Sequence, residues 1–321
     1  AADDADAAAA PARLATIRSQ ATLDYRHAGR RFVAPATVDE LAAAVEALPD
    51  ATILSGGTDV GLWVTKRAFD PETIIFTGRC AALARIERTD GEILIGAGAL
   101  HEAARLAVAG AYPDMAELLR RFGGNQVRSA GTVGGNVANG SPIGDWPPAL
   151  IAAGATLVLR KGAARRELPI EDFFLAYGRQ DRRPGEFVEA IRLPLPRPGT
   201  AFRAYKISKR FDSDITAVLG CFAFAFEGDR IASARIASGG MAGIPARARA
   251  AEAALAGRPF DEAALADAGA ALGRDFTPIG DMRASAGYRM TVARNLLARA
   301  RIEILSPDIP TRLAGPVPLV A

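Results

Sequence analysis

Residues 123–148 limit the folds open to this chain, because their density of glycine, asparagine, serine and proline suits neither an uninterrupted helix nor a strand. Loops longer than about 12 to 15 residues inside a compact domain are usually functional or disordered. Apolar residues recur through this segment, at positions 127, 133, 137, 143 and 146. We therefore predict an ordered, functional loop that packs on its own apolar side chains.

The residues before this loop alternate short helices with short strands. Thr37 followed by Glu40 has the pattern of a capping box in front of periodic apolar residues, which predicts a helix over 38–48. Apolar runs bounded by glycine and polar residues predict strands at 52–55, 73–77, 92–96 and 156–160, a helical turn at 62–66, and helices at 100–109 and 114–121. The order around residue 56 is therefore strand, glycine loop, helix start.

The pattern changes after residue 193. A strand at 187–193 runs into Pro194, Pro196 and Pro198, which mark the best candidate domain boundary. Strands are expected at 202–206, 215–226 and 231–238, with a hairpin at 227–230, and helices at 247–256, 261–271 and 284–303. Strands followed by helices indicate a separate α+β domain. We predict a linker or arm at 1–23, a first domain at 24–198, a second at 199–304 and a tail at 305–321.

The chain of 321 residues contains two cysteines and two histidines, so its capacity for metal chemistry is small. Cys80 and Cys221 cannot by themselves ligate an iron–sulfur cluster or a four-ligand zinc site, and we expect no metal on this chain. His27 and His101 are solitary, and such histidines are mostly structural or surface residues. Two unpaired cysteines, and a start that does not have the pattern of a signal peptide, favour the cytoplasm.

The charge pattern argues against a nucleic-acid partner, and the length of the apolar runs argues against a membrane partner. Lys plus Arg is 39 and Asp plus Glu is 36, a net charge of +3, and the signs are mixed along the chain, so no nucleic-acid partner is expected. No apolar run reaches the roughly 18 residues of a membrane span, so no membrane partner is expected either.

Two glycine clusters do not fit familiar nucleotide fingerprints. Gly96 and Gly98 follow a predicted strand, but His101 replaces the third glycine of a dinucleotide fingerprint. We expect replacement of this histidine by alanine to leave ligand binding unaffected. Gly56 to Gly61 has the spacing of a Walker A loop, yet Leu62 and Trp63 stand where lysine and serine or threonine must contact phosphate and magnesium. This difference argues against an ATPase.

A different use of glycine fits better. Consecutive backbone N–H groups in the loop 55–61, with the Thr58 hydroxyl, can converge on a diphosphate without a lysine. The segment 130–145 adds glycines that permit close approach, and polar groups at Thr132, Asn136, Ser141 and Asp145. A large, flat, diphosphate-bearing ligand suits two such loops. The alternative is that both are elaborate turns without a ligand.

Both segments together resemble a known family. Leu54-Ser-Gly-Gly-Thr-Asp-Val-Gly61 and the run from Gln126 to Asp145 are similar to the FAD-binding segment of xanthine dehydrogenases, most closely the small subunit of the bacterial enzymes. Ser238 to Met241 and Pro245 to Arg247 resemble the domain that closes the flavoproteins of the molybdenum hydroxylases. The resemblance spans residues 24–304. It implies an α+β fold: a two-subdomain FAD-binding domain of the PCMH or vanillyl-alcohol-oxidase type, then an antiparallel sheet with a helical bundle.

The resemblance also implies a set of cofactor contacts. FAD would be contacted by Ile53, Leu54, Ser55, Gly56, Gly57, Thr58, Asp59, Val60, Phe122, Thr132, Gly135, Asn136, Ser141, Asp145, Val188 and Lys206. Phe122 would stack on the isoalloxazine, Asp145 would lie on the ribose and phosphate side, and Lys206 would tune the flavin electrostatically. Asp59 and Tyr177 would lie near NAD⁺. No side chain of this chain is expected to act as a catalytic acid, base or nucleophile.

By the same resemblance, FAD accepts electrons from [2Fe–2S] clusters and reduces NAD⁺ while hypoxanthine and xanthine are oxidised to urate at a molybdopterin centre. The clusters are expected upstream in the same polypeptide and the molybdopterin on a large subunit, in a heterotetramer outside which the chain is inactive. Residues 210–214 depart from the loop of the animal members, and their role stays open. The alternatives are a flavoprotein for carbon monoxide or aromatic substrates, and a nucleotide-binding module with no redox role.

Overall fold

The computed structural model describes residues 2–17 and 21–311. The segment predicted as an arm forms helix α1 (Ala2–Ile17), followed by a hairpin of β1 (Leu23–His27) and β2 (Arg30–Ala34) that the sequence patterns did not predict. Alanine has the strongest helix propensity of all residues, which accounts for a helix in this alanine-rich stretch. Within the described ranges, no helix is long and apolar enough to span a membrane.

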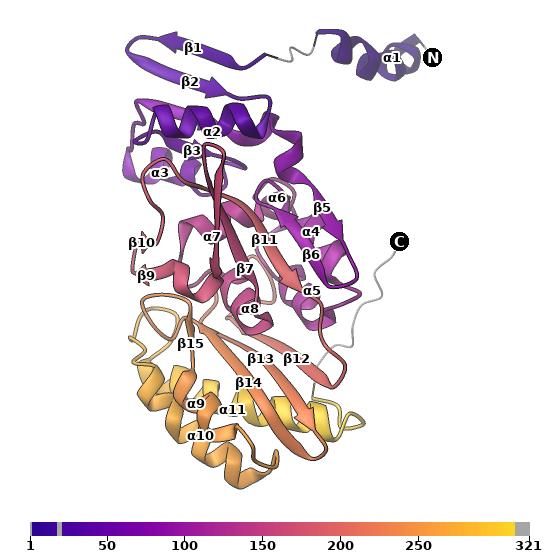
Figure 1. Ribbon diagram of the computed structural model, residues 1–321, viewed down its shortest axis with the longest axis vertical. Coiled ribbons are helices and arrows are strands. Elements are labelled where there is room, and N and C mark those ends of the chain that lie inside the picture. The colour runs from indigo at the N-terminus through magenta and orange to yellow at the C-terminus, as the bar shows by residue number, and fades with distance from the viewer. Residues whose placement is uncertain (1, 18–20, 312–321) are drawn as a thin grey trace.

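The chain builds three layers along its long axis (Figure 1). The first contains the four-stranded sheet β1-β2-β4-β3, in which β3 (Thr52–Leu54) and β2 both pair in parallel with β4 (Thr73–Phe76). Helices α2 (Val38–Ala47) and α3 (Val60–Arg67) accompany it. The capping box is confirmed, because the Thr37 hydroxyl accepts from the Glu40 N–H and the Glu40 carboxylate accepts from the Thr37 N–H.

The middle layer contains an antiparallel sheet of five strands in the order β5-β6-β11-β7-β8. The strands are β5 (Ile86–Arg88), β6 (Glu92–Gly96), β7 (Thr156–Lys161), β8 (Ala164–Pro169) and β11 (Phe187–Pro194). Helices α4 (His101–Val108) and α5 (Pro113–Arg120) lie in this layer. Of the 3₁₀ turns, η2 (Ala81–Ala84) contacts β6 and η3 (Ile170–Phe173) contacts β7 and β8, whereas η1 (Thr77–Arg79) contacts β2 and β3 of the first layer. Strands β9 (Phe174–Ala176) and β10 (Arg179–Gln180) form a small separate hairpin.

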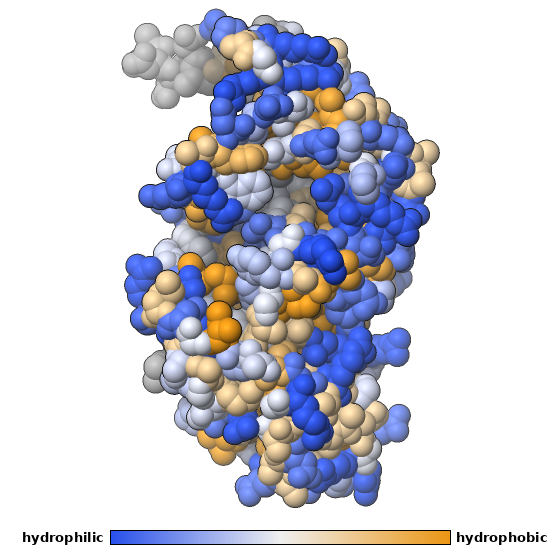
Figure 2. Space-filling view, turned by 90° about the vertical axis from the view of Figure 1, so that its left-hand side faces the viewer, coloured by the Kyte–Doolittle hydropathy of each residue, from blue (hydrophilic) through white to orange (hydrophobic). Residues whose placement is uncertain are grey.

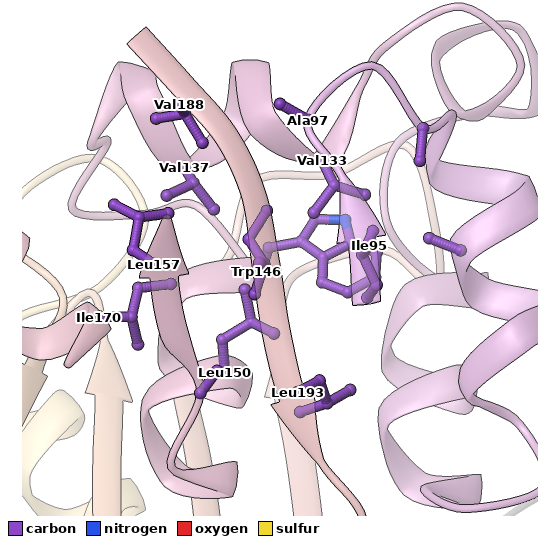
Figure 3. Packing of buried hydrophobic residues seen from close by; sticks show 14 of the residues in the cluster. Ile95, Ala97, Val133, Val137, Trp146, Leu150, Leu157, Ile170, Val188 and Leu193 are labelled. Carbon is purple, nitrogen blue, oxygen red and sulfur yellow. The ribbon is translucent and has the colours of Figure 1, made fainter. Parts of the chain in front are cut away.

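The prediction of a long irregular loop at 123–148 is wrong in its secondary structure. The segment contains α6 (Asn125–Arg128) and α7 (Val133–Asn139), and it ends in α8 (Trp146–Ala153). Its predicted packing is borne out for Val133, Val137 and Trp146, which are fully buried. Figure 3 shows the indole of Trp146 below Val133 and Val137 of α7 and beside β11.

The third layer contains the antiparallel sheet β12-β13-β14-β15 and three helices. Its elements are β12 (Thr200–Ile207), β13 (Val218–Glu227), β14 (Arg230–Gly239), β15 (Ala246–Arg247), α9 (Arg249–Leu255), α10 (Glu262–Asp275) and α11 (Ala286–Leu305). The predicted α+β architecture, with a sheet and helices closing the chain, is confirmed.

The two faces of this last sheet explain how the layers join. Leu219 and Cys221 of β13 belong to the core of the middle layer, whereas Phe222 and Phe224 belong to a second core with α9, α10 and α11. Alternate residues of a strand point to opposite faces, so one strand serves both cores. Helix α8 is buried on every side between the two sheets, as expected for a helix that is apolar all round.

Candidate functional site

A cavity of about 710 Å³ opens between the first and middle layers. The loop after β3, the segment from Thr132 to Gly144, Phe187 and Val188 of β11, and the β9–β10 hairpin contribute its walls. The surface is hollowed at the level of α3 and this hairpin (Figure 2). Ligand sites of drug-sized molecules typically measure about 300 to 1,000 Å³. The space is therefore large enough for a nucleotide cofactor.

The loop after β3 supplies free hydrogen-bond donors. Among the described residues, the backbone N–H groups of Gly56, Gly57 and Thr58 have no protein acceptor. Asp59 stands at the N-cap of α3 but makes no capping hydrogen bond. Unpaired N–H groups that precede a helix N-terminus attract anions. This wall of the cavity suits the diphosphate of a dinucleotide.

The second glycine segment supplies close packing rather than donors. The N–H groups of Val133 and Gly134 donate to the carbonyls of Ala99 and Ala97, both at 2.9 Å, and the Gly135 N–H donates to the Thr132 hydroxyl at 3.2 Å. A Cβ atom on Gly134 would lie 2.3 Å from the Ala97 Cβ. Glycine at 134 therefore lets α7 lie against β6 and form the opposite wall.

Two buried polar atoms on the cavity wall lack a protein partner. The Asn136 Oδ1 and Thr77 Oγ1 atoms are buried, and no hydrogen bond within the described residues satisfies them. Both residues line the cavity. A buried polar atom without a partner costs about 1 to 3 kcal/mol, which a bound ligand can recover. Together with the free N–H groups, these atoms fit a ligand that is rich in hydrogen-bonding groups, such as FAD.

Phe122 lies on the cavity wall against a histidine that sequence analysis assigned to structure alone. The Phe122 ring meets the His101 ring edge-on, with centroids 4.7 Å apart. The His101 Nδ1 atom accepts a hydrogen bond from the Trp146 Nε1 at 3.0 Å. Burial lowers the pKa of His101 to about 4, so the ring is neutral at pH 7. His101 also lines the cavity. The expectation that its replacement leaves ligand binding unaffected did not take this position into account.

Arg128 holds the backbone that carries Phe122. Its Nη1 atom donates to the carbonyls of Arg120, Phe122 and Gly123 at 3.0, 3.2 and 3.1 Å. Its Nε atom donates to the Glu102 carboxylate at 3.1 Å. Sequence analysis did not predict this role, because it depends on contacts that only folding brings together.

Asp145 and Lys206 are placed differently from the prediction that they contact FAD. The Lys206 Nζ atom lies 2.7 Å from the Asp145 Oδ2, and the Thr216 hydroxyl donates to the Asp145 Oδ1 at 2.5 Å. The Asp145 and Lys206 side chains are each 2% exposed, and neither lines the cavity. Their charges compensate each other inside the protein, where Asp145 of the middle layer meets Lys206 and Thr216 of the last third of the chain.

Most of the predicted contacts are nevertheless brought together. The cavity is lined by Ile53, Ser55, Gly56, Gly57, Thr58, Asp59, Val60, Phe122, Thr132, Gly135, Asn136, Ser141 and Val188. Leu54 is not part of the wall, although its neighbours are. Tyr177 is 77% exposed and lies outside the wall, next to Gly178, which lines it. Among the described residues, no group of three or more potential ligands is placed to hold a metal ion.

Known families account for this architecture. The FAD binding domain of molybdopterin dehydrogenases matches residues 26–196, and the C-terminal domain of carbon monoxide dehydrogenase flavoproteins matches residues 203–304. The chain belongs to the molybdenum hydroxylase flavoproteins. It thus has the FAD-binding domain of this oxidoreductase family, followed by the family's closing domain.

Individual relatives come from more than one branch of the family. The carbon monoxide dehydrogenase medium chain of Hydrogenophaga pseudoflava is 30% identical over 84% of this chain and 94% of its own length. A xanthine dehydrogenase of Emericella nidulans is 29% identical over 88% of this chain, which spans only 22% of that protein. The crystal structure of the Hydrogenophaga pseudoflava carbon monoxide dehydrogenase aligns with a TM-score of 0.79 and 29% identity, over 86% of this chain and 96% of that one.

The buried Asp145–Lys206 pair generates a stability prediction. Asp145→Asn leaves the Lys206 ammonium buried without a counter-charge, and we expect the free energy of unfolding to fall by about 3 to 5 kcal/mol. The double variant Asp145→Asn with Lys206→Met removes the unpaired charge and should recover much of this loss. Urea denaturation of both variants measures the difference. A double variant as unstable as the single one would contradict an internal ion pair.

The depressed pKa of His101 predicts a pH dependence of stability. Between pH 6.5 and pH 4 the unfolded chain binds a proton at this ring and the folded chain does not, so stability falls as the pH falls through this range. The loss approaches about 3 kcal/mol near pH 4. In His101→Asn, which has no titrating ring, this part of the acid destabilisation should be absent. Urea denaturation at pH 7, 5.5 and 4.5 measures it, with His27→Asn as the control.

Proposed function

We propose that this chain is the FAD-bearing electron-transfer segment of a xanthine dehydrogenase. The observation that carries the FAD assignment is one cavity that is lined both by the glycine loop with its free N–H groups and by Asn136 and Thr77, whose Oδ1 and Oγ1 atoms are unsatisfied. The first loop, Gly56-Gly-Thr-Asp-Val-Gly61, favours the xanthine type, since the flavoproteins for carbon monoxide and aromatic substrates usually have a different sequence there. Similarity to fungal xanthine dehydrogenase supports the same proposal.

Bound FAD supplies the redox chemistry, accepting electrons singly or in pairs and giving up a hydride. The residues of this chain bind and orient it. The N–H groups of Gly56, Gly57 and Thr58 would hold the diphosphate, and the Phe122 ring would pack against the isoalloxazine. Thr132 and Asn136 would complete the hydrogen bonding from the opposite wall.

The acceptor is proposed to be NAD⁺. Asp59 lines the cavity, and Tyr177 exposes an aromatic ring beside its rim, at Gly178. An exposed tyrosine next to a nucleotide site can stack on a base or on a nicotinamide. These two residues would contact NAD⁺.

The remaining redox centres are proposed to lie outside this chain, in the cytoplasm. Both cysteines are buried and free, and neither is available as a cluster ligand. The proposed partners are upstream [2Fe–2S] domains of the same polypeptide and a large molybdopterin subunit, in a heterotetramer that oxidises hypoxanthine and xanthine to urate. The proposed boundaries of the two domains are 24–198 and 199–304.

A second candidate is the flavoprotein of a carbon monoxide or aromatic-substrate hydroxylase. It is favoured by alignments that cover nearly the whole length of two such proteins, the carbon monoxide dehydrogenase medium chain at 94% and the nicotine 6-hydroxylase medium subunit of Paenarthrobacter nicotinovorans at 96%. In that case the chain would be a separate medium subunit beside an iron–sulfur subunit. The FAD site is the same in both candidates.

FAD binding is tested by substitution of the diphosphate loop. Gly57 has a φ of +72° and lies on the cavity wall, so Gly57→Val strains the loop and obstructs it. We expect the variant to lose flavin absorbance, with a dissociation constant for FAD at least tenfold higher. Gly29→Val is the matched control, because Gly29 has a φ of +77° and open space around it but lies in the β1–β2 turn. A wild-type chain without flavin bands after incubation with FAD would exclude the redox function.

The proposed acceptor is tested on the reduced, FAD-loaded chain without oxygen. We expect NAD⁺ to restore the flavin absorbance in stopped-flow experiments, and Asp59→Asn to change that rate by about tenfold, because Asp59 is exposed and lines the cavity where NAD⁺ would dock. Asp90→Asn, an exposed carboxylate outside the cavity wall, is the control. No reoxidation by NAD⁺, with normal reoxidation by dioxygen, would exclude NAD⁺ as the acceptor.

A further inference from the structure

His101 lies at the junction of α4 and the two glycine segments. Its side chain is buried, and it begins α4 directly after the turn that follows β6. The His101 N–H donates to the Gly131 carbonyl at 3.1 Å, which ties α4 to the second glycine segment. The imidazole therefore stands at the point where this segment approaches the first glycine loop.

The partner of one ring nitrogen determines the state of the other. Trp146 Nε1 can only donate, so the Nδ1 atom of His101, at 3.0 Å, must accept and carries no proton. The proton of the neutral ring is then on Nε2. His101 is 3% exposed, and this burial opposes a second proton on the ring. The indole thus holds the imidazole in one tautomer, with Nε2–H as its outward donor.

The Nε2–H group faces the cavity between the two glycine loops. A Cβ atom built on Gly131 would lie 2.8 Å from the His101 Nε2 and 3.0 Å from the Thr58 Oγ1, so these two atoms flank the same point. Both residues line the cavity. Within the part of the chain that the structure describes, the Nε2 atom has no hydrogen-bond acceptor. The loop that carries the Thr58 hydroxyl also carries the backbone N–H groups of residues 56–58, which have no acceptor among the described residues.

We infer that His101 is a ligand-binding residue whose Nε2–H donates, together with the Thr58 hydroxyl, to a diphosphate oxygen of the bound dinucleotide. This inference rests on the proposed FAD site. An imidazole N–H, a hydroxyl and several backbone N–H groups without acceptors lie on one region of the cavity wall, and a diphosphate, with its several charged oxygens, is well suited to accept from them. Because the ring is neutral, it binds the anion as an oriented dipole and adds no charge. Trp146 is its positioning residue.

Nuclear magnetic resonance of the imidazole nitrogens tests this directly. The chain has only two histidines, so ¹⁵N-histidine labelling produces signals from His101 and from the exposed His27, which serves as an internal control. At pH 7 the free chain should show His101 as the Nε2–H tautomer. Addition of FAD, and of ADP as a probe with the same 5′-diphosphate, should shift the Nε2–H resonance and slow its exchange with water. The His27 signals should stay unchanged.

Three outcomes would overturn the inference. One is bound FAD, seen by its absorbance, with an unchanged His101 spectrum. Another is a shift of the His101 resonance on addition of riboflavin but not of ADP, which would show that His101 contacts the flavin ring system and not the diphosphate. The third is an Nδ1–H tautomer in the free chain, because that tautomer cannot accept from Trp146. If FAD does not bind at all, the proposed FAD site fails, and the His101 assignment fails with it.

A matched pair of variants separates ligand binding from support of the fold. His101→Asn places an amide oxygen near the former Nδ1, where it can accept the hydrogen bond from Trp146, but its side chain is too short to place a donor at the former Nε2 position. His101→Gln has an amide nitrogen that reaches the former Nε2 position. We expect the dissociation constant for FAD to rise about tenfold in His101→Asn and less in His101→Gln. Equal affinities of His101→Asn and the wild type, both folded by circular dichroism, would contradict a donor role.

Discussion

The cavity depends on one close approach between two backbones. A Cβ atom on Gly56 would lie 1.9 Å from the Ala130 carbonyl oxygen, so only glycine lets the first glycine loop rest on the second. This contact holds the loop after β3, in the first layer, against the second glycine segment, and both segments line the cavity. The same device recurs at Gly134, which packs on Ala97 of the middle layer. Glycine in these segments therefore serves the assembly of the walls as much as the approach of a ligand.

The two glycine segments contribute different chemistry to the site. The first leaves backbone N–H groups free at residues 56–58, whereas the N–H groups at 133–135 are satisfied within the protein. Behind the second segment, Trp146 and His101 form a hydrogen bond in the core, and Arg128 fixes the carbonyls around Phe122. Buried polar groups are satisfied almost everywhere in folded proteins. Asn136 Oδ1 and Thr77 Oγ1 are unsatisfied and their residues line the cavity, so a bound ligand can complete their hydrogen bonding.

The last third of the chain supports the site from outside the cavity. Asp145, next to Gly144 of the cavity wall, pairs with Lys206 and Thr216 inside the protein. Arg235 of β14 donates to the Ile151 carbonyl at the end of α8 and pairs with Glu171 of the middle layer at 2.7 Å. These contacts connect the sheet β12-β13-β14-β15 to the layer that holds Phe122 and His101. A charged pair that sequence analysis assigned to the cofactor instead joins two parts of the fold, because burial lets opposite charges compensate each other.

Local patterns in the sequence determined the capped helix at Thr37, the hairpin at 227–230, the strand–loop–helix order around Gly56 and the glycine loop that lines the cavity. These features depend on neighbours within a few positions, so short-range rules predict them. Tertiary structure decided that 123–148 contains helices, since Gly134 in the first turn of α7 packs on the distant Ala97. It also decided that His101 faces the cavity while Asp145 and Lys206 do not. Such outcomes depend on which distant groups share a buried volume, and the order of residues along the chain does not record that.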